Sequence, residues 1–134
     1  MKLSSKTIAA IKLFVDLGEH YDGDFISLLD VAERKDLSKK FLEQIVPMYK
    51  SRGLLLCTRG NQGGYRLAKL PKDISLKDII YPSESFFQPG DVKYPPIEEA
   101  LKELEKKTAD YFAAISLSDL VEKQREQYAV SYVI

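Results

Sequence analysis

Residues 58–66 read Thr58-Arg59-Gly60-Asn61-Gln62-Gly63-Gly64-Tyr65-Arg66 and connect two short apolar runs, 54–58 and 65–69. Two short strands joined by a glycine-bearing loop are typical of a β-hairpin with a longer connection. The three glycines permit positive φ angles at the tip and let its backbone approach another molecule closely. An arginine stands at each end of the tip. The stretch therefore predicts a basic hairpin, although Arg66, on a strand, could instead point back to the body.

Two short helices are predicted directly before this hairpin. Residues 27–34 begin with an N-cap candidate, Ser27, and repeat apolar residues at helical spacing. A short turn at 35–37 leads to a second N-cap candidate, Ser38, and Gly53 ends the second helix. One buried stripe of this second helix is formed by Leu42, Ile45, Val46 and Tyr49.

A helix-turn-helix followed by a basic hairpin is the arrangement of a winged helix, and most winged helices bind duplex DNA. The polar face of the second helix carries long side chains that can reach bases and phosphates. Taken alone, that helix could equally be an amphipathic helix with a solvated charged face. We expect the DNA-contacting residues to be Lys2, Ser27, Ser38, Lys39, Lys40, Glu43, Gln44, Arg59 and Gln62.

The order of these motifs resembles one family of bacterial winged-helix regulators, which includes the iron–sulfur regulator IscR, the nitric-oxide sensor NsrR and the cysteine-metabolism repressor CymR. The resemblance is carried by residues 1–6, 27–34, 42–45, 53–54, 59–67, 75–80 and 109–120. It implies a mainly α fold with a small β-hairpin, in which a winged helix-turn-helix is followed by a long C-terminal dimerisation helix. It also implies a transcriptional regulator that binds double-stranded DNA as a homodimer.

Two features depart from the family pattern. Members that bind an iron–sulfur cluster carry three cysteines between the hairpin and the long helix, whereas residues 81–96 here contain none. The single cysteine, Cys57, cannot supply the three or four ligands that a cluster usually needs. We therefore expect no cofactor and a colourless, iron-free protein. Many members also have an Arg-Tyr pair in the first helix, where this chain reads Thr7-Ile8-Ala9.

The C-terminal part predicts a helix that pairs with another helix. From residue 97 the apolar positions alternate in steps of four and three, with Thr108 filling one gap, which is a heptad seam. A homodimer fits because two-fold DNA sites need two reading heads; burial against its own domain is the alternative. We expect a DNA-binding domain at 1–80, a proline-rich linker at 81–96, and a dimerisation helix with its tail at 97–134. The expected dimerisation residues are Ile97, Leu101, Leu104, Tyr111 and Ile115.

Composition and charge agree with a small regulator. The 134 residues are 45% hydrophobic, enough for one domain or for one domain with an extension. No apolar run approaches 18 residues, so we expect a soluble cytoplasmic protein. Residues 1–72 hold 13 Lys and Arg against 8 Asp and Glu, whereas residues 73–134 hold 7 against 12. A basic DNA-binding domain followed by an acidic C-terminal part would produce this division of charge. The first helix, residues 3–19, should direct Ile8, Ile11, Phe14 and Val15 inward.

Enzyme chemistry is not indicated. His20 is the only histidine, and no phosphate-binding or dinucleotide-binding glycine motif occurs. The linker aromatics Tyr81, Phe86, Phe87 and Tyr94 either line a small-molecule pocket or close the linker over the core. We expect a repressor controlled by a small-molecule effector or by a protein partner. The rival hypothesis is a winged-helix module that reads a partner protein and tunes another regulator.

Overall fold

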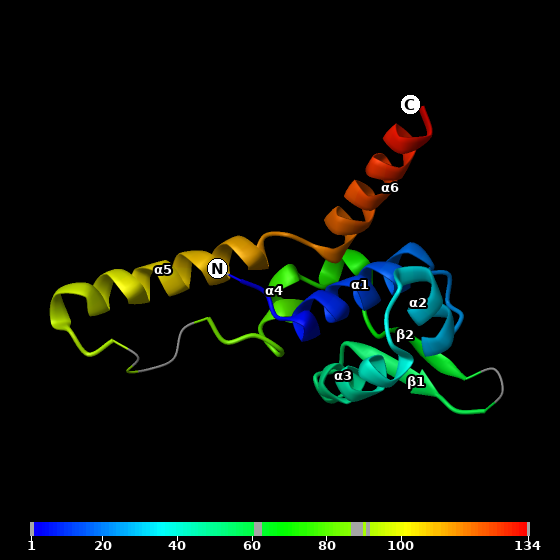
Figure 1. Ribbon diagram of the computed structural model, residues 1–134, viewed down its shortest axis with the longest axis horizontal. Helices are drawn as coiled ribbons and strands as arrows, with labels where there is room; N and C mark the ends of the chain where they lie inside the picture. Colours follow the sequence, from blue (N-terminus) through cyan, green and yellow to red (C-terminus); the bar gives the residue numbers. More distant parts are fainter. Residues whose placement is uncertain (1, 61–62, 87–89, 91, 134) are drawn as a thin grey trace.

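The computed structural model describes residues 2–60, 63–86, 90 and 92–133, with side chains as far as Ala129. It confirms the predicted mainly α fold with a small hairpin (Figure 1). None of the described helices is long and apolar enough to cross a membrane. The elements are α1 (Ser5–Glu19), α2 (Leu28–Lys35), α3 (Lys39–Ser51), β1 (Leu55–Thr58), β2 (Gly64–Leu67), η1 (Pro71–Asp73), α4 (Leu76–Ile80), α5 (Pro95–Ala113) and α6 (Leu117–Val133).

The core of the body is formed by α1, α2, α3, the hairpin, α4 and the start of α6. Phe14 of α1 packs edge-on against Tyr49 of α3, with ring centroids 4.9 Å apart. The buried Tyr49 hydroxyl donates to the Ile79 carbonyl and so ties α3 to α4. The expectation for Ile8 was wrong, because its side chain is 42% exposed. The inward stripe of α1 passes through Thr7, Ala10, Phe14 and Leu17, which leaves Ile8 on the outer side.

An ion pair joins α1 to α2 beneath this core. Asp16 is only 1% exposed, and both of its carboxylate oxygens accept from the Arg34 guanidinium, each at 2.9 Å. The hydrogen bond to Asp16 raises the pKa of Arg34. Since the pair is bidentate, it sets the angle between α1 and the first helix of the helix-turn-helix.

The turn after α3 positions the hairpin. Gly53 has a φ of 73°, and the Leu54 amide donates back to the Tyr49 carbonyl at 3.1 Å. A left-handed glycine after the last helical turn stops the helix and redirects the chain into β1. The two antiparallel strands pair from Leu55 with Leu67 to Thr58 with Gly64.

A third segment joins the hairpin to the start of α2. Ile26 and Tyr65 exchange backbone hydrogen bonds of 2.9 and 2.8 Å. Gly64 lies so close to this bridge that a Cβ atom built on it would overlap the Ile26 carbonyl group. The absence of a side chain at Gly64 therefore lets the hairpin close onto the helix-turn-helix.

The C-terminal part contains two helices, where the heptad pattern predicted one. The first helix begins at Pro95 rather than at residue 97, with a proline in its first turn, and ends at Ala113. Ile115 lies in the connection to α6, outside the helix in which the seam placed it. The second helix starts because Ser116 and Asp119 cap it reciprocally: each backbone amide donates to the other's side chain, at 2.9 and 3.0 Å.

The start of α6 is anchored to the body, whereas α5 extends away from it (Figure 1). Ser116 pairs with Ser75, the cap of α4, and the flanking backbone hydrogen bonds measure 2.7 and 2.8 Å. Leu117 and Val121 are buried against α1 beside Gly18. No residue of α5 is fully buried.

Candidate nucleic-acid interface

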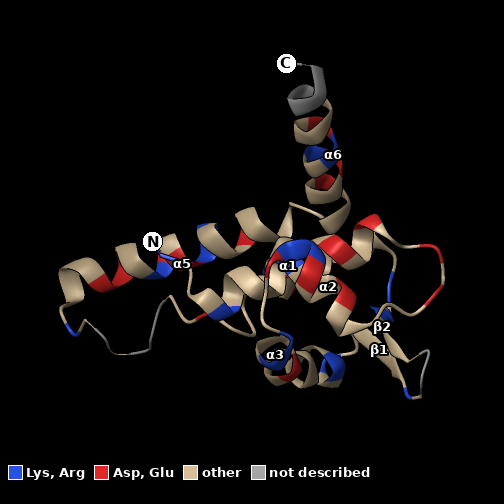
Figure 2. Cartoon of the chain, turned by 45° about the vertical axis from the view of Figure 1, so that its right-hand side comes forward, with Lys and Arg blue, Asp and Glu red and all other residues tan. Residues whose placement is uncertain are grey.

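The exposed face of α3 carries the polar residues that the sequence singled out. The N-cap Ser38 and the helix residues Lys39, Lys40, Glu43 and Gln44 are all exposed. Their positions lie opposite the buried stripe of Leu42, Ile45, Val46 and Tyr49. The Lys and Arg residues coloured blue on α3 and near the hairpin tip belong to the part of the chain that lies away from α6 (Figure 2). The exposed polar residues of α3 and the basic residues near the hairpin tip thus lie in the same part of the molecule.

An ion pair on this face joins Lys39 to Glu43. The Lys39 ammonium lies 3.6 Å from the Glu43 carboxylate, and both side chains are about half exposed. An exposed pair of this kind stabilises a helix by only about 0.3–0.5 kcal/mol. Phosphate oxygens can therefore compete for Lys39 at little cost to the fold.

Two serines of the expected site act as helix caps. The Ser27 hydroxyl accepts from the Asp30 amide at 3.1 Å, and the Ser38 hydroxyl accepts from the Phe41 amide at 3.2 Å. Each hydroxyl keeps its own proton, which can be donated to a phosphate at the positive end of the helix dipole. Lys2 is exposed just before α1.

The two arginines of the hairpin differ in environment. Arg59 is exposed immediately after β1, next to Gly60, which has a φ of 108°. Arg66 points back to the body: it donates to the Gly23 carbonyl at 2.7 Å, and its guanidinium lies 4.7 Å from the centroid of the Phe25 ring. Only Arg59 is therefore available to a partner. Gln62 lies outside the described residues.

Sequence reasoning missed a polar cluster at the start of α1. Thr7 is fully buried, and its hydroxyl lies 2.8 Å from both the Ser83 hydroxyl and the Glu84 carboxylate. The Ser4 amide donates to the same carboxylate at 2.8 Å, and this hydrogen bond lowers the pKa of Glu84. A Ser4-Thr7 pair at a helix start is a weak signal, and nothing in the sequence reveals a partner 77 residues away.

Comparison with known proteins identifies the family. A family model described as Rrf2, iron-dependent transcriptional regulator, matches residues 3–123. The chain belongs to the Rrf2 family. Protein rrf2 of Nitratidesulfovibrio vulgaris is 30% identical over 89 residues, which are 66% of this chain and 59% of that protein. IscR of Aliivibrio salmonicida is 35% identical over 80 residues, 60% of this chain and 48% of that protein. The matches thus span about half the length of these relatives.

Solved structures of Rrf2 proteins share the fold. The T. potens IscR structure superposes with a TM-score of 0.80 at 30% identity, covering 95% of this chain and 90% of that one. CymR, the global cysteine regulator of B. subtilis, gives a TM-score of 0.76 at 25% identity, covering 92% of this chain and 98% of that one. The predicted family resemblance is confirmed, and the family and these relatives are transcriptional regulators, not enzymes.

The donor set of this chain does not fit an iron–sulfur cluster. Its only cysteine, Cys57, lies in β1, and its only histidine, His20, follows the last turn of α1. Among the described residues, no three His, Cys, Asp or Glu side chains lie close enough together to hold a metal ion. A cluster held by three or four cysteines cannot be assembled from the one thiolate that this chain contributes.

Proposed function

We propose that this Rrf2 protein is a sequence-specific regulator that binds duplex DNA as a homodimer in the cytoplasm. The observation that carries the proposal is the exposed face of α3, where Lys39, Lys40, Glu43 and Gln44 surround the N-terminal turn beside the hairpin. The first turn of the second helix in a helix-turn-helix contacts base edges in the major groove. Lys39 and Lys40 bind phosphates, Gln44 pairs with an adenine, and Glu43 accepts from a cytosine.

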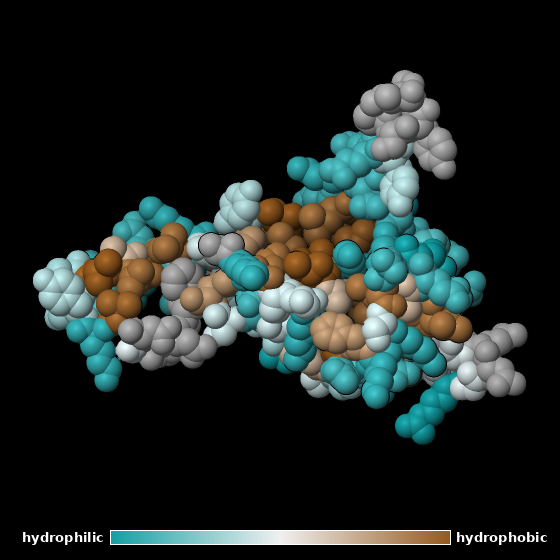
Figure 3. Space-filling model, in the orientation of Figure 1, coloured by the Kyte–Doolittle hydropathy of each residue, from teal (hydrophilic) through white to brown (hydrophobic). Residues whose placement is uncertain are grey.

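The homodimer is proposed from the surface of α5. Three seam residues, Ile97, Leu104 and Tyr111, are 43%, 51% and 67% exposed in the single chain. Figure 3 shows apolar side chains gathered over the far end of α5 and where α5 and α6 meet the body. A second α5 covers this surface and places two α3 helices in successive major grooves. Leu101 and Ile115 are half-buried and border the same seam.

We propose that the protein represses transcription, on the basis of the same homodimer. A dimer seated on a promoter blocks polymerase, so we propose a repressor. The protein acts without an iron–sulfur cluster, and its DNA affinity responds to a small ligand or a partner protein. Residues 1–80 form the reading domain, 81–96 the linker, and 97–134 the dimerisation segment.

The recognition helix is tested by selecting bound fragments from a random duplex pool and then by measuring variants on the selected site. Gln44→Ala is expected to cost about 1–3 kcal/mol of binding free energy and to relax the preference at one base pair. Glu43→Ala is expected to strengthen binding to unrelated duplexes, because it removes a charge that repels phosphate and frees Lys39 from its ion pair. Fluorescence anisotropy measures both effects.

The matched control is Glu33→Ala, an exposed carboxylate on α2 outside the reading face. If Gln44→Ala and Glu43→Ala both retain the base preference of the unchanged protein, α3 is not the reader. If no duplex is enriched at all, the proposal fails, and the rival winged-helix module that binds a partner protein takes its place.

The hairpin gives a separate prediction. Arg59→Ala is expected to weaken duplex binding and to reduce the slope of log affinity against log salt by about one unit, since one phosphate contact is lost. Lys69→Ala is the control, because Lys69 is also exposed but follows β2, at the opposite end of the hairpin from the tip. An unchanged slope for Arg59→Ala would place the hairpin away from DNA.

A further inference from the structure

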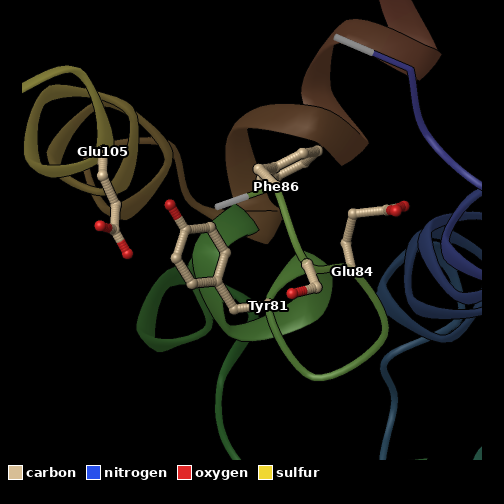
Figure 4. Close-up of a pocket in the computed structure, with 5 residues that line it drawn as sticks. Tyr81, Glu84, Phe86 and Glu105 are labelled. Atoms are coloured by element: carbon tan, nitrogen blue, oxygen red, sulfur yellow. The ribbon is translucent and has the colours of Figure 1, made fainter. Parts of the chain in front are cut away.

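A small pocket lies between the end of α4, the linker and α5 (Figure 4). Its volume is about 170 Å³, and it is lined by Tyr81, Glu84, Ser85, Phe86 and Glu105. An apolar cavity of about 150 Å³ holds a benzene molecule. The pocket therefore has room for one small organic molecule.

One side of this pocket is aromatic. The rings of Tyr81, Phe86 and Phe112 form a cluster with centroid separations of 6.2 to 6.4 Å. The Lys77 ammonium already lies 5.6 Å from the centroid of the Tyr81 ring. The electron-rich faces of such rings attract cations. The aromatic cluster thus favours a ligand that combines hydrocarbon with positive charge.

The polar groups of the pocket also favour a positively charged ligand. The Tyr81 hydroxyl is buried and has no hydrogen-bond partner among the described residues. It is directed to the side on which the Glu105 carboxylate lies (Figure 4). Among the described residues, Glu105 forms no salt bridge. A buried hydroxyl without a partner costs free energy, which a ligand that hydrogen-bonds to it recovers.

Burial, followed by the nearby carboxylates of Glu105 and Asp110, raises the pKa of Tyr81. The hydroxyl is therefore neutral at physiological pH and can accept a hydrogen bond. The two carboxylates that line the pocket, those of Glu84 and Glu105, repel anions and attract cations. The Glu84 carboxylate contributes less to ligand binding, because it is already held by Ser4 and Thr7.

We propose that this pocket binds a small organic cation, a protonated amine of roughly benzene size, as the effector of the protein. The ammonium pairs with the Glu105 carboxylate and donates to the Tyr81 hydroxyl oxygen, while the hydrocarbon part packs against Phe86. The effector role rests on the DNA-binding function proposed above; the binding site does not.

The pocket borders both the proposed dimerisation helix and the segment that holds the start of α1. Glu105 belongs to α5, the proposed dimerisation helix, and Glu84 holds the start of α1 through Ser4 and Thr7. A ligand between Tyr81 and Glu105 fixes the angle between α5 and the reading domain. In a homodimer that angle sets the separation of the two α3 helices, and so the fit to two half-sites.

Binding is tested by titrating the full chain with benzylamine, benzyl alcohol and benzoate, which match in size but differ in charge. Benzylamine is expected to shift the NMR signals of Tyr81, Phe86 and Phe112, whereas benzyl alcohol binds at least about tenfold more weakly and benzoate does not bind. Glu105→Gln is expected to weaken benzylamine binding about two- to fivefold, because Glu105 is exposed and an ion pair with an exposed carboxylate is weak. Glu103→Gln is the control, since it removes the same charge from an exposed position on α5 that pairs with Lys107.

Tyr81→Phe is expected to weaken benzylamine binding without destabilising the fold, because the hydroxyl that it removes has no partner within the described residues. Equal affinity for benzylamine and benzyl alcohol, or no effect of Glu105→Gln, overturns the proposed site. Saturating benzylamine is expected to change the affinity for the selected duplex at least about fivefold, and the duplex must change benzylamine affinity by the same factor. Binding without this coupling overturns the effector role. Failure to bind any duplex is a separate result, which leaves the titration without DNA unchanged.

Discussion

Replacing Arg34 with alanine is expected to lower the free energy of unfolding by about 3 kcal/mol, the lower end of the range for breaking a buried ion pair. Asp16 is 1% exposed in the intact pair, and among the described residues the other group recorded as an ion-pair partner of its carboxylate is the half-exposed His20 ring, at 3.8 Å. Arg34 itself is 38% exposed, so the loss comes mainly from the charge left behind. Urea denaturation followed by circular dichroism measures the change.

Two further variants test whether the stability lost in Arg34→Ala comes from the unpaired Asp16 charge or from the removal of a side chain. Lys39→Ala breaks the exposed pair with Glu43 and should change stability by less than about 0.5 kcal/mol. Adding Asp16→Asn to Arg34→Ala should restore part of the lost stability, because a neutral amide is less costly to bury than an unpaired carboxylate. An Arg34→Ala protein as stable as the unchanged one would mean that the pair does not hold α1 to α2.

Gly64→Val is expected to destabilise the fold by about 2–4 kcal/mol and to abolish duplex binding. The added side chain overlaps the Ile26 carbonyl group and comes within 2.9 Å of the Ser27 nitrogen. The hairpin must then separate from the segment before α2, which breaks the two hydrogen bonds between Ile26 and Tyr65. Thermal unfolding and anisotropy with the selected duplex measure the two losses.

Gly23→Ala is the control for this prediction. Gly23 has a φ of 101°, and nothing lies within 4 Å of an added Cβ atom, so only backbone strain of about 1–2 kcal/mol is expected. The position of Gly64 is different because space rather than backbone conformation excludes a side chain there. If Gly64→Val unfolded at the same temperature as the unchanged protein, the hairpin would not depend on this close contact.

The local signals in the sequence predicted most helix boundaries. Ser27 and Ser38 were assigned as N-caps, and the hydroxyl of each accepts from a backbone amide of its helix. Ser116-Leu117-Ser118-Asp119 repeats the capping pattern of Ser75-Leu76-Lys77-Asp78 and marks the start of α6. A heptad pattern depends on apolar spacing alone, so it continues past the end of α5 at Ala113. The cap residues Ser116 and Asp119 mark the start of a new helix there.

Other features depend on contacts that no local pattern contains. Both hairpin arginines are basic and lie near the tip in sequence, yet Arg66 is held by Gly23 and Phe25. Ile8 satisfies the helical period but lies on the outer side of α1. The pocket beside Tyr81 needs α5 to return beside the linker, and the choice between an aromatic pocket and a closed linker could not be made from composition.

The most direct test of the proposed function is duplex binding as a function of salt. The full chain, purified under anaerobic conditions and free of iron, is titrated against the selected duplex and against an unrelated duplex at several salt concentrations. We expect tight binding to the selected site, at least about 10³-fold weaker binding to the unrelated one, and an affinity that falls steeply as salt rises. Equal affinity for both duplexes, or no binding until iron and sulfide are supplied, would contradict a cluster-free, sequence-specific DNA-binding regulator.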